Sequence, residues 1–260
     1  MKILESIISF LQFRMQRPTI YGWFHILCIV CVIGVTIFLV LKKYDVKKTL
    51  LVLSTIMLLF EVYKQLSFSF NDGKWEYQWY AFPFQFCSVP MYIAFIASFV
   101  KNSKIEKCLY GFLATYGLVA GIGVMAYPVT VFIEEILINI QTMVHHGFMV
   151  VIGLVLLING HVKLNYQTII NGFWVFLIAV CIAVSVNTVT YLIDFEGGLE
   201  LFFISPFHAS SLPVFSTLYP LMPYPIFLVL YLLVFTIGGF IPIGVVYAIK
   251  KLTKKSVGDN

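Results

Sequence analysis

Two adjacent histidines, His145 and His146, lie inside an apolar run that opens at Gln141 and continues to Ile158. An imidazole within a membrane helix is costly unless another polar group pairs with it, so such residues generally mark a functional site. Successive residues of a helix point about 100° apart, so only one of the two rings can face the interior of a helix bundle. The pair predicts a polar site at this depth of the membrane.

Cys87 is the candidate nucleophile for such a site, because a thiolate attacks an ester carbonyl once a neighbouring imidazole has removed the thiol proton. Cys87 lies in a segment predicted to be a transmembrane helix, and Phe84, Cys87 and Ser88 share one face of that helix (i, i+3, i+4). Asn187 and Tyr191 share a helix face in the same way. The hypothesis is acyl chemistry with Cys87 as nucleophile and a histidine as general base.

Five polar residues are candidates for binding or orienting a ligand: Glu61, Gln85, His145, Asn187 and Tyr191. Some of the polar residues also have a purely structural explanation. Glu61 can form an ion pair with Lys64 on its own helix, and Asn187 can hydrogen-bond a neighbouring helix. Cys87 can be a small packed side chain, and His25 can lie at the membrane interface.

The composition assigns the chain to the membrane proteins. It is 60% hydrophobic and 11% charged, whereas roughly a quarter of the residues of a soluble domain are charged. Its apolar runs have the length of helices, so the predicted fold class is an all-α, polytopic membrane helix bundle. The net charge of +5 comes from lysines in short loops, which gives no sign of a nucleic-acid partner. We expect no cofactor and no metal, because no metal-ligand spacing is present.

About seven transmembrane helices are predicted, although six remain open if one apolar run does not cross. The predicted spans are Ile20–Leu41, Thr49–Phe68, Phe82–Val100, Cys108–Tyr127, Ile138–Asn159, Thr168–Leu192 and Tyr224–Ile249.

Two segments outside the spans complete the predicted organisation. Residues 1–19 contain an amphipathic helix expected to lie in the membrane interface, and residues 20–255 form a single bundle. Residues 194–223 are too rich in proline for one helix and are expected to form a capping or re-entrant loop. Gly117 and Gly121 form a GxxxG pattern, which favours close helix packing and leaves open a homo-oligomer or a partner membrane protein.

The lysines predict the orientation of the chain. With seven spans, twelve lysines fall on the side of the C-terminus, which places that end in the cytoplasm and the N-terminus outside. His25, Glu61, Cys87, the histidine pair and Asn187 then all lie in the outer part of the bilayer. The sequence therefore predicts a polar cavity open towards the outer leaflet. The outer side of the membrane, opposite the twelve lysines, carries only Lys74 together with seven acidic residues, Asp72, Glu76, Glu134, Glu135, Asp194, Glu196 and Glu200.

Three stretches resemble the YwaF family of bacterial integral membrane proteins, which is related to an animal acyltransferase of ether phospholipids. They are residues 82–87 (FPFQFC), His146–Gly147 at the head of an apolar span, and residues 187–192 followed by 219–225 (YPLMPYP). The likeness covers most of residues 50–240. Where the bacterial relatives carry a histidine this chain has Gln85, and where the animal relatives carry a cysteine after the proline it has Phe84.

The resemblance implies a multi-pass protein of the bacterial plasma membrane that acts on membrane lipids, phospholipids above all. In that case Cys87 attacks an ester, His146 serves as the base, Asn187 or Gln85 stabilises the oxyanion, and Glu61 orients the imidazole. The alternative is a transporter or lipid-binding protein without covalent chemistry, in which the same cavity holds a solute or a headgroup.

Overall fold

The computed structural model describes residues 2–71 and 73–258. The chain forms two compact units: a first unit of Met1–Ser98 with Ala120–Val151, and a second unit of Phe99–Val119 with Ile152–Asn260. A single bundle over residues 20–255 stays a prediction. In chain order the elements are α1 (Lys2–Leu11), α2 (Trp23–Lys42), α3 (Val46–Ser69), β1 (Phe70–Asn71), β2 (Lys74–Trp75), η1 (Trp79–Ala81), α4 (Val89–Phe99), α5 (Ser103–Phe112), the π-helix η2 (Leu113–Gly117), α6 (Leu118–Ala126), α7 (Ile136–Ile158), α8 (Tyr166–Leu192), η3 (Leu201–Phe203), α9 (Phe215–Leu218), η4 (Tyr219–Leu221) and α10 (Tyr224–Gly258).

The protein is a helical membrane protein with five candidate spans in the part of the chain described: α2, the continuous run α5–η2–α6, α7, α8 and α10. The predicted count of about seven is not confirmed. The predicted second span is α3, which carries Glu61 and Lys64 and is not among the five. The predicted third span is shortened to α4, whose eleven residues are too few to cross a bilayer. Of the residues in the charge count, Asp72 and the side chains of Lys254 and Lys255 lie outside the description.

The shortened third span corrects one expectation about the site. Residues 82–88 are not helical but form a loop and a turn, in which the Ser88 N–H donates to the Gln85 carbonyl at 2.8 Å. Phe84, Cys87 and Ser88 therefore do not share a helix face. α4 starts only at Val89 and has Pro90 in its first turn, where the missing N–H of proline costs no helix hydrogen bond. The chain is thus irregular where Cys87 lies.

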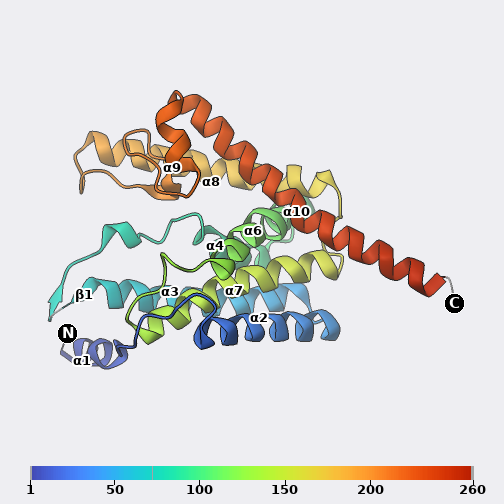
Figure 1. The fold of residues 1–260 in the computed structure, drawn as a ribbon, viewed down its shortest axis with the longest axis horizontal. Helices are drawn as coiled ribbons and strands as arrows, with labels where there is room; N and C mark the ends of the chain where they lie inside the picture. Colours follow the sequence, from blue (N-terminus) through green and yellow to red (C-terminus); the bar gives the residue numbers. More distant parts are fainter. Residues whose placement is uncertain (1, 72, 259–260) are drawn as a thin grey trace. The chain divides into compact units, whose positions relative to one another are not determined.

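In the first unit, α2, α3 and α7 run side by side (Figure 1). Two glycines allow close approach to α7. A Cβ on Gly147 would overlap Val32 of α2, and one on Gly121 of α6 would lie 2.9 Å from the His146 carbonyl oxygen. Gly121 of the predicted GxxxG pattern therefore packs within the unit and sets α6 directly against the backbone of the histidine pair.

The N-terminal helix is docked on the first unit along one face. α1 ends at the half-buried Leu11 and buries Ile8, whereas Ile3, Leu4, Ile7 and Phe10 are exposed. The Gln12 amide donates to the carbonyls of Ser67 and Phe70 at 2.9 and 2.8 Å. An amphipathic helix with an unburied apolar face suits the predicted place at a membrane surface. Met1, included in that prediction, lies outside the described residues.

In the second unit, α5 and α8 cross at two glycines. A Cβ on Gly172 would lie 2.7 Å from both the carbonyl carbon of Gly111 and the backbone nitrogen of Phe112. Only glycine at both positions lets the two backbones come this close, as in small-residue contacts between membrane helices.

We therefore expect Gly172→Ala to destabilise the protein by about 1–3 kcal/mol, because neither backbone can move without disturbing the rest of the crossing. The measurement is thermal unfolding in detergent micelles. Gly34→Ala in α2 is the matched control, since no described atom lies within 4 Å of a Cβ there. Equal melting temperatures for the two variants would show that α5 and α8 do not pack closely enough at Gly172 to exclude a methyl group.

The segment predicted as a cap, residues 194–223, packs on the second unit. Asn187 binds it through both amide atoms, accepting the Leu201 N–H at 2.7 Å and donating to the Leu201 carbonyl at 3.0 Å. Tyr224 and Tyr231 donate to the carbonyls of Ile204 and Phe202 at 2.8 and 3.3 Å. Polar side chains thereby satisfy backbone groups of Leu201, Phe202 and Ile204 in this irregular stretch.

Candidate functional site

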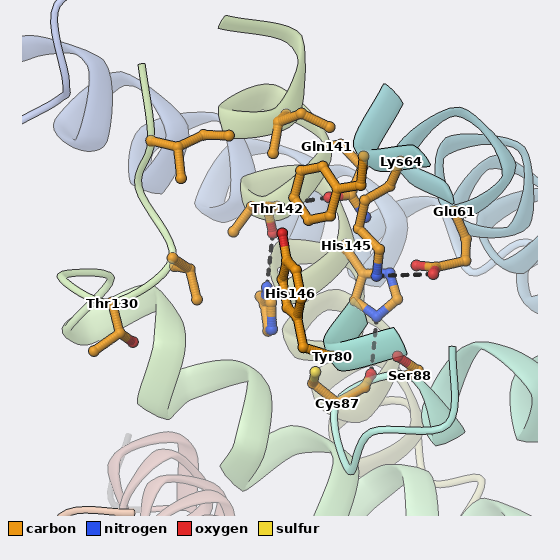
Figure 2. Close-up of a pocket in the computed structure, with 14 residues that line it drawn as sticks. Glu61, Lys64, Tyr80, Cys87, Ser88, Thr130, Gln141, Thr142, His145 and His146 are labelled. Atoms are coloured by element: carbon orange, nitrogen blue, oxygen red, sulfur yellow. Dashed lines mark hydrogen bonds and ion pairs between the residues drawn. The ribbon is translucent and has the colours of Figure 1, made fainter. Parts of the chain in front are cut away.

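The first unit contains a cavity of about 270 Å³ bounded by α3, by residues of the 80–88 and 130–133 loops, and by α7. Asn139, on the first turn of α7, holds the second loop. Its amide oxygen accepts the Ile133 N–H at 2.9 Å, and its nitrogen donates to the Ile133 carbonyl at 2.7 Å. Figure 2 shows Glu61, Lys64, Cys87 and both histidines around this cavity. Four of the seven predicted site residues therefore meet here.

His146 is fixed in one tautomer by its own helix. Its Nδ1 lies 2.7 Å from the Thr142 carbonyl, an acceptor, so Nδ1 carries the proton and donates it (Figure 2). Nε2 is consequently the unprotonated nitrogen. This atom is buried and has no hydrogen-bond partner among the described residues. His146 therefore presents an oriented, unoccupied lone pair in the cavity, as a general base requires.

His145 is fixed in the opposite tautomer. Its Nε2 lies 2.8 Å from the Cys87 carbonyl and donates to it, which ties α7 to the irregular loop (Figure 2). The unprotonated nitrogen is Nδ1, again buried and without a partner in the described chain. Both side chains are buried and both line the one cavity, so the expectation that only one of the two rings could face the interior is wrong.

His25 shows what a structural histidine looks like in this protein. It is completely buried, its Nδ1 accepts the Tyr21 N–H at 3.0 Å, and its Nε2 donates to the Met125 carbonyl at 2.8 Å. Both ring nitrogens are thus satisfied, as is usual for buried polar groups. The structural alternative for His25 fits these contacts, and it does not fit the histidine pair.

Glu61 and Lys64 form an ion pair at the cavity, with Oε1 of the carboxylate 2.8 Å from the ammonium (Figure 2). Gln65 also donates to Oε1 at 2.7 Å and is itself held by the Tyr77 hydroxyl at 2.8 Å. The second carboxylate oxygen, Oε2, is buried and lacks a hydrogen-bond partner within the described residues. The ion pair thus gives the cavity a positioned cation, the Lys64 ammonium, and an anionic hydrogen-bond acceptor, Oε2 of Glu61.

Cys87 lies in the loop before α4, outside the candidate spanning helices, and lines the same cavity. Burial raises the pKa of its thiol, so the thiol is protonated and requires a base to become a nucleophile. Its sulfur makes no hydrogen bond to His146, whose Nε2 is without a partner. Catalytic hydrogen bonds often tighten only when substrate is bound, so the shared cavity is the relevant observation.

The other three predicted residues do not line the cavity. Asn187 belongs to the second unit, and both of its amide atoms are used by Leu201. Tyr191, also in the second unit, stacks on Phe207 with ring centroids 3.9 Å apart. Gln85 lies two residues before Cys87 but is not among the lining residues. For Asn187, the structural alternative fits these contacts.

Sequence reasoning missed the parts of the site that are made by the backbone. The carbonyls of Thr142 and Cys87 fix the two tautomers, and no side-chain pattern reveals either. For Thr142 a signal existed, because residues four apart on a helix lie on the same face, which places Thr142 next to His146. From the sequence, Lys64 is predicted only as a partner of Glu61, whereas in the structure it also lines the cavity.

Together, the helices and the site define a multi-pass membrane protein with a polar cavity inside one of its units. Within the described chain no cluster of three or more histidine, cysteine or acidic residues is arranged to hold a metal. The chain belongs to the TMEM164 family, whose family model matches residues 15–241 and so includes every residue that lines the cavity. Comparisons with curated proteins and with solved structures give no match.

Proposed function

We propose that this protein transfers or hydrolyses lipid acyl groups through a thioester on Cys87, with His146 as the general base. The observation that supports it best is the buried, unpartnered Nε2 of His146 in the cavity that Cys87 also lines. The resemblance to the YwaF family, which is related to an animal acyltransferase of ether phospholipids, points to the same chemistry. The substrate is a phospholipid or another lipid-linked ester, which reaches the cavity from the outer leaflet in the orientation that the lysines predict.

The first half-reaction moves one proton and one acyl group. Nε2 of His146 takes the thiol proton, and the sulfur attacks the ester carbonyl to form a tetrahedral intermediate. The carbon–oxygen bond to the leaving alcohol then breaks, and the imidazolium returns its proton to that oxygen. The products are a thioester on Cys87, the free alcohol and a neutral His146.

Lys64 replaces Asn187 and Gln85 as the group that stabilises the oxyanion. Its ammonium lines the cavity, and the contact with Glu61 holds it in place. A fixed cation in a site of low dielectric constant stabilises negative charge that develops on the carbonyl oxygen. The proposed role of Glu61 accordingly shifts from orienting the imidazole to positioning Lys64.

The test is to incubate the purified protein with phosphatidylethanolamine and phosphatidylglycerol vesicles that carry radiolabelled acyl chains. We expect label on the protein that neutral hydroxylamine releases, as it does a thioester, and that Cys87→Ala abolishes. Cys181→Ala is the matched control, because Cys181 is exposed on α8 and does not line the cavity. A wild-type protein that stays unlabelled, or a fully labelled Cys87→Ala variant, would refute the thioester.

The second candidate function is binding or transport without a covalent step. The observation that favours it is the group of three buried acceptors without partners in the described chain, Glu61 Oε2, His145 Nδ1 and His146 Nε2. Such a group suits a ligand that donates several hydrogen bonds. This function predicts that Cys87→Ala is tolerated, whereas the thioester mechanism predicts that it is not.

A further inference from the structure

The thioester mechanism assigns no role to one buried titratable group in the cavity, the imidazole of His145. His145 lines the cavity, and its Nδ1 has no hydrogen-bond partner in the part of the chain described. If His145 served only to tie α7 to the Cys87 loop, its Nε2 would be enough for that bond. Its Nδ1 would then be expected to have a hydrogen-bond partner, as both ring nitrogens of the structural His25 do. An unsatisfied buried acceptor costs about 1–3 kcal/mol, so the unpartnered Nδ1 of His145 is best explained by a ligand that hydrogen-bonds to it.

We propose that His145 is the base of the second half-reaction: its Nδ1 takes the proton of the hydroxyl group, on an alcohol or on water, that removes the acyl group from Cys87. This inference rests on the proposed function. It divides the two proton transfers between two imidazoles, with His146 acting on the thiol and His145 acting on the incoming hydroxyl.

The geometry supports this division in two ways. His145 donates to the Cys87 carbonyl, so its ring is held next to the residue that carries the acyl group. The centroids of the two rings lie 5.3 Å apart with an interplanar angle of 62°, so their free nitrogens serve different positions in the cavity.

The step balances as follows. The hydroxyl oxygen attacks the thioester carbonyl while its proton passes to Nδ1 of His145, and the carbon–sulfur bond breaks. The sulfur leaves as a thiolate and receives the proton from the imidazolium, directly or through solvent. The products are a new ester, or a free fatty acid when the hydroxyl belongs to water, together with the thiol of Cys87 and a neutral His145.

His145→Gln tests the role, because a glutamine amide can still donate to the Cys87 carbonyl but has no basic nitrogen. In the radiolabelled vesicles, we expect acylation of Cys87 to fall less than about tenfold. Turnover should fall about 100-fold, the lower range for loss of a general base, so the labelled thioester accumulates. Hydroxylamine needs no base to react, so it should release the label from this variant as fast as from the wild type.

Three results would overturn the inference. One is turnover of His145→Gln within a few-fold of the wild type. Another is a melting temperature like that of the wild type combined with a loss of acylation, which would make His145 a positioning residue for the Cys87 loop. The third is the absence of label on Cys87 in both proteins, which would refute the proposed function and this inference with it. If His145→Gln does not fold, His145→Asn, which also lacks a basic nitrogen, is used in the same assay, and its rate of Cys87 acylation shows whether the Cys87 loop has kept its position.

Discussion

Replacing His146 with asparagine is expected to lower the rate at which Cys87 is acylated by about 1,000-fold, within the range for loss of a general base. The asparagine amide can keep the hydrogen bond that Nδ1 makes to the Thr142 carbonyl, but it offers no lone pair in place of Nε2. The thiol of Cys87, whose pKa is raised by burial, then stays protonated. The measurement is the initial rate of hydroxylamine-sensitive labelling from radiolabelled phospholipid vesicles.

The matched control is His161→Asn, which changes an exposed histidine in the loop after α7 without touching the cavity. It should label at the wild-type rate. The comparison with His145→Gln is equally informative, because that variant should lose the second half-reaction and not the first. If His146→Asn melts like the wild type and still labels Cys87 at the wild-type rate, then His146 is not the base.

The sequence predicted the long apolar helices well because their signal is local. The predicted spans over residues 138–159 and 168–192 correspond to α7 and α8 with boundaries that differ by no more than a few residues. The exception is the segment from Phe82, which has the composition of a span but is a loop until Val89. Its path depends on contacts made elsewhere, such as the His145 bond to the Cys87 carbonyl, and hydropathy does not report these.

The candidate site was predictable to the extent that depth in the membrane predicts proximity. Glu61, Cys87 and the two histidines line one cavity, although the predicted depths assumed that α3 and the segment from Phe82 are spans, and neither is among the candidate spans of the described chain. Asn187 was placed at the same depth, but depth says nothing about which partner a side chain meets. Its amide is used by Leu201, a residue of the irregular segment 194–223 whose position no periodic pattern could give.

Removal of the Glu61 side chain is expected to have the largest effect on stability. In Glu61→Ala the ammonium of Lys64 loses its partner at 2.8 Å, while the Lys64 side chain remains only 18% exposed. Gln65 loses an acceptor at 2.7 Å and keeps the Ala81 carbonyl. An unpaired buried charge costs about 3–5 kcal/mol, so we expect a loss of about 3 kcal/mol for this partly exposed lysine. Thermal unfolding in detergent measures it.

A double variant separates the charge from the cavity that the substitution creates. Glu61→Gln with Lys64→Met removes both charges and keeps an amide oxygen for Gln65, so it should recover most of the stability that Glu61→Ala loses. If the double variant is as unstable as Glu61→Ala, the cost lies in packing and not in the unpaired ammonium. The folded double variant should nevertheless acylate Cys87 about 100-fold more slowly, because the cation proposed for the oxyanion is gone. If the double variant recovers stability but not activity, Lys64 has a chemical role, and the role of Glu61 is to hold the Lys64 ammonium in place.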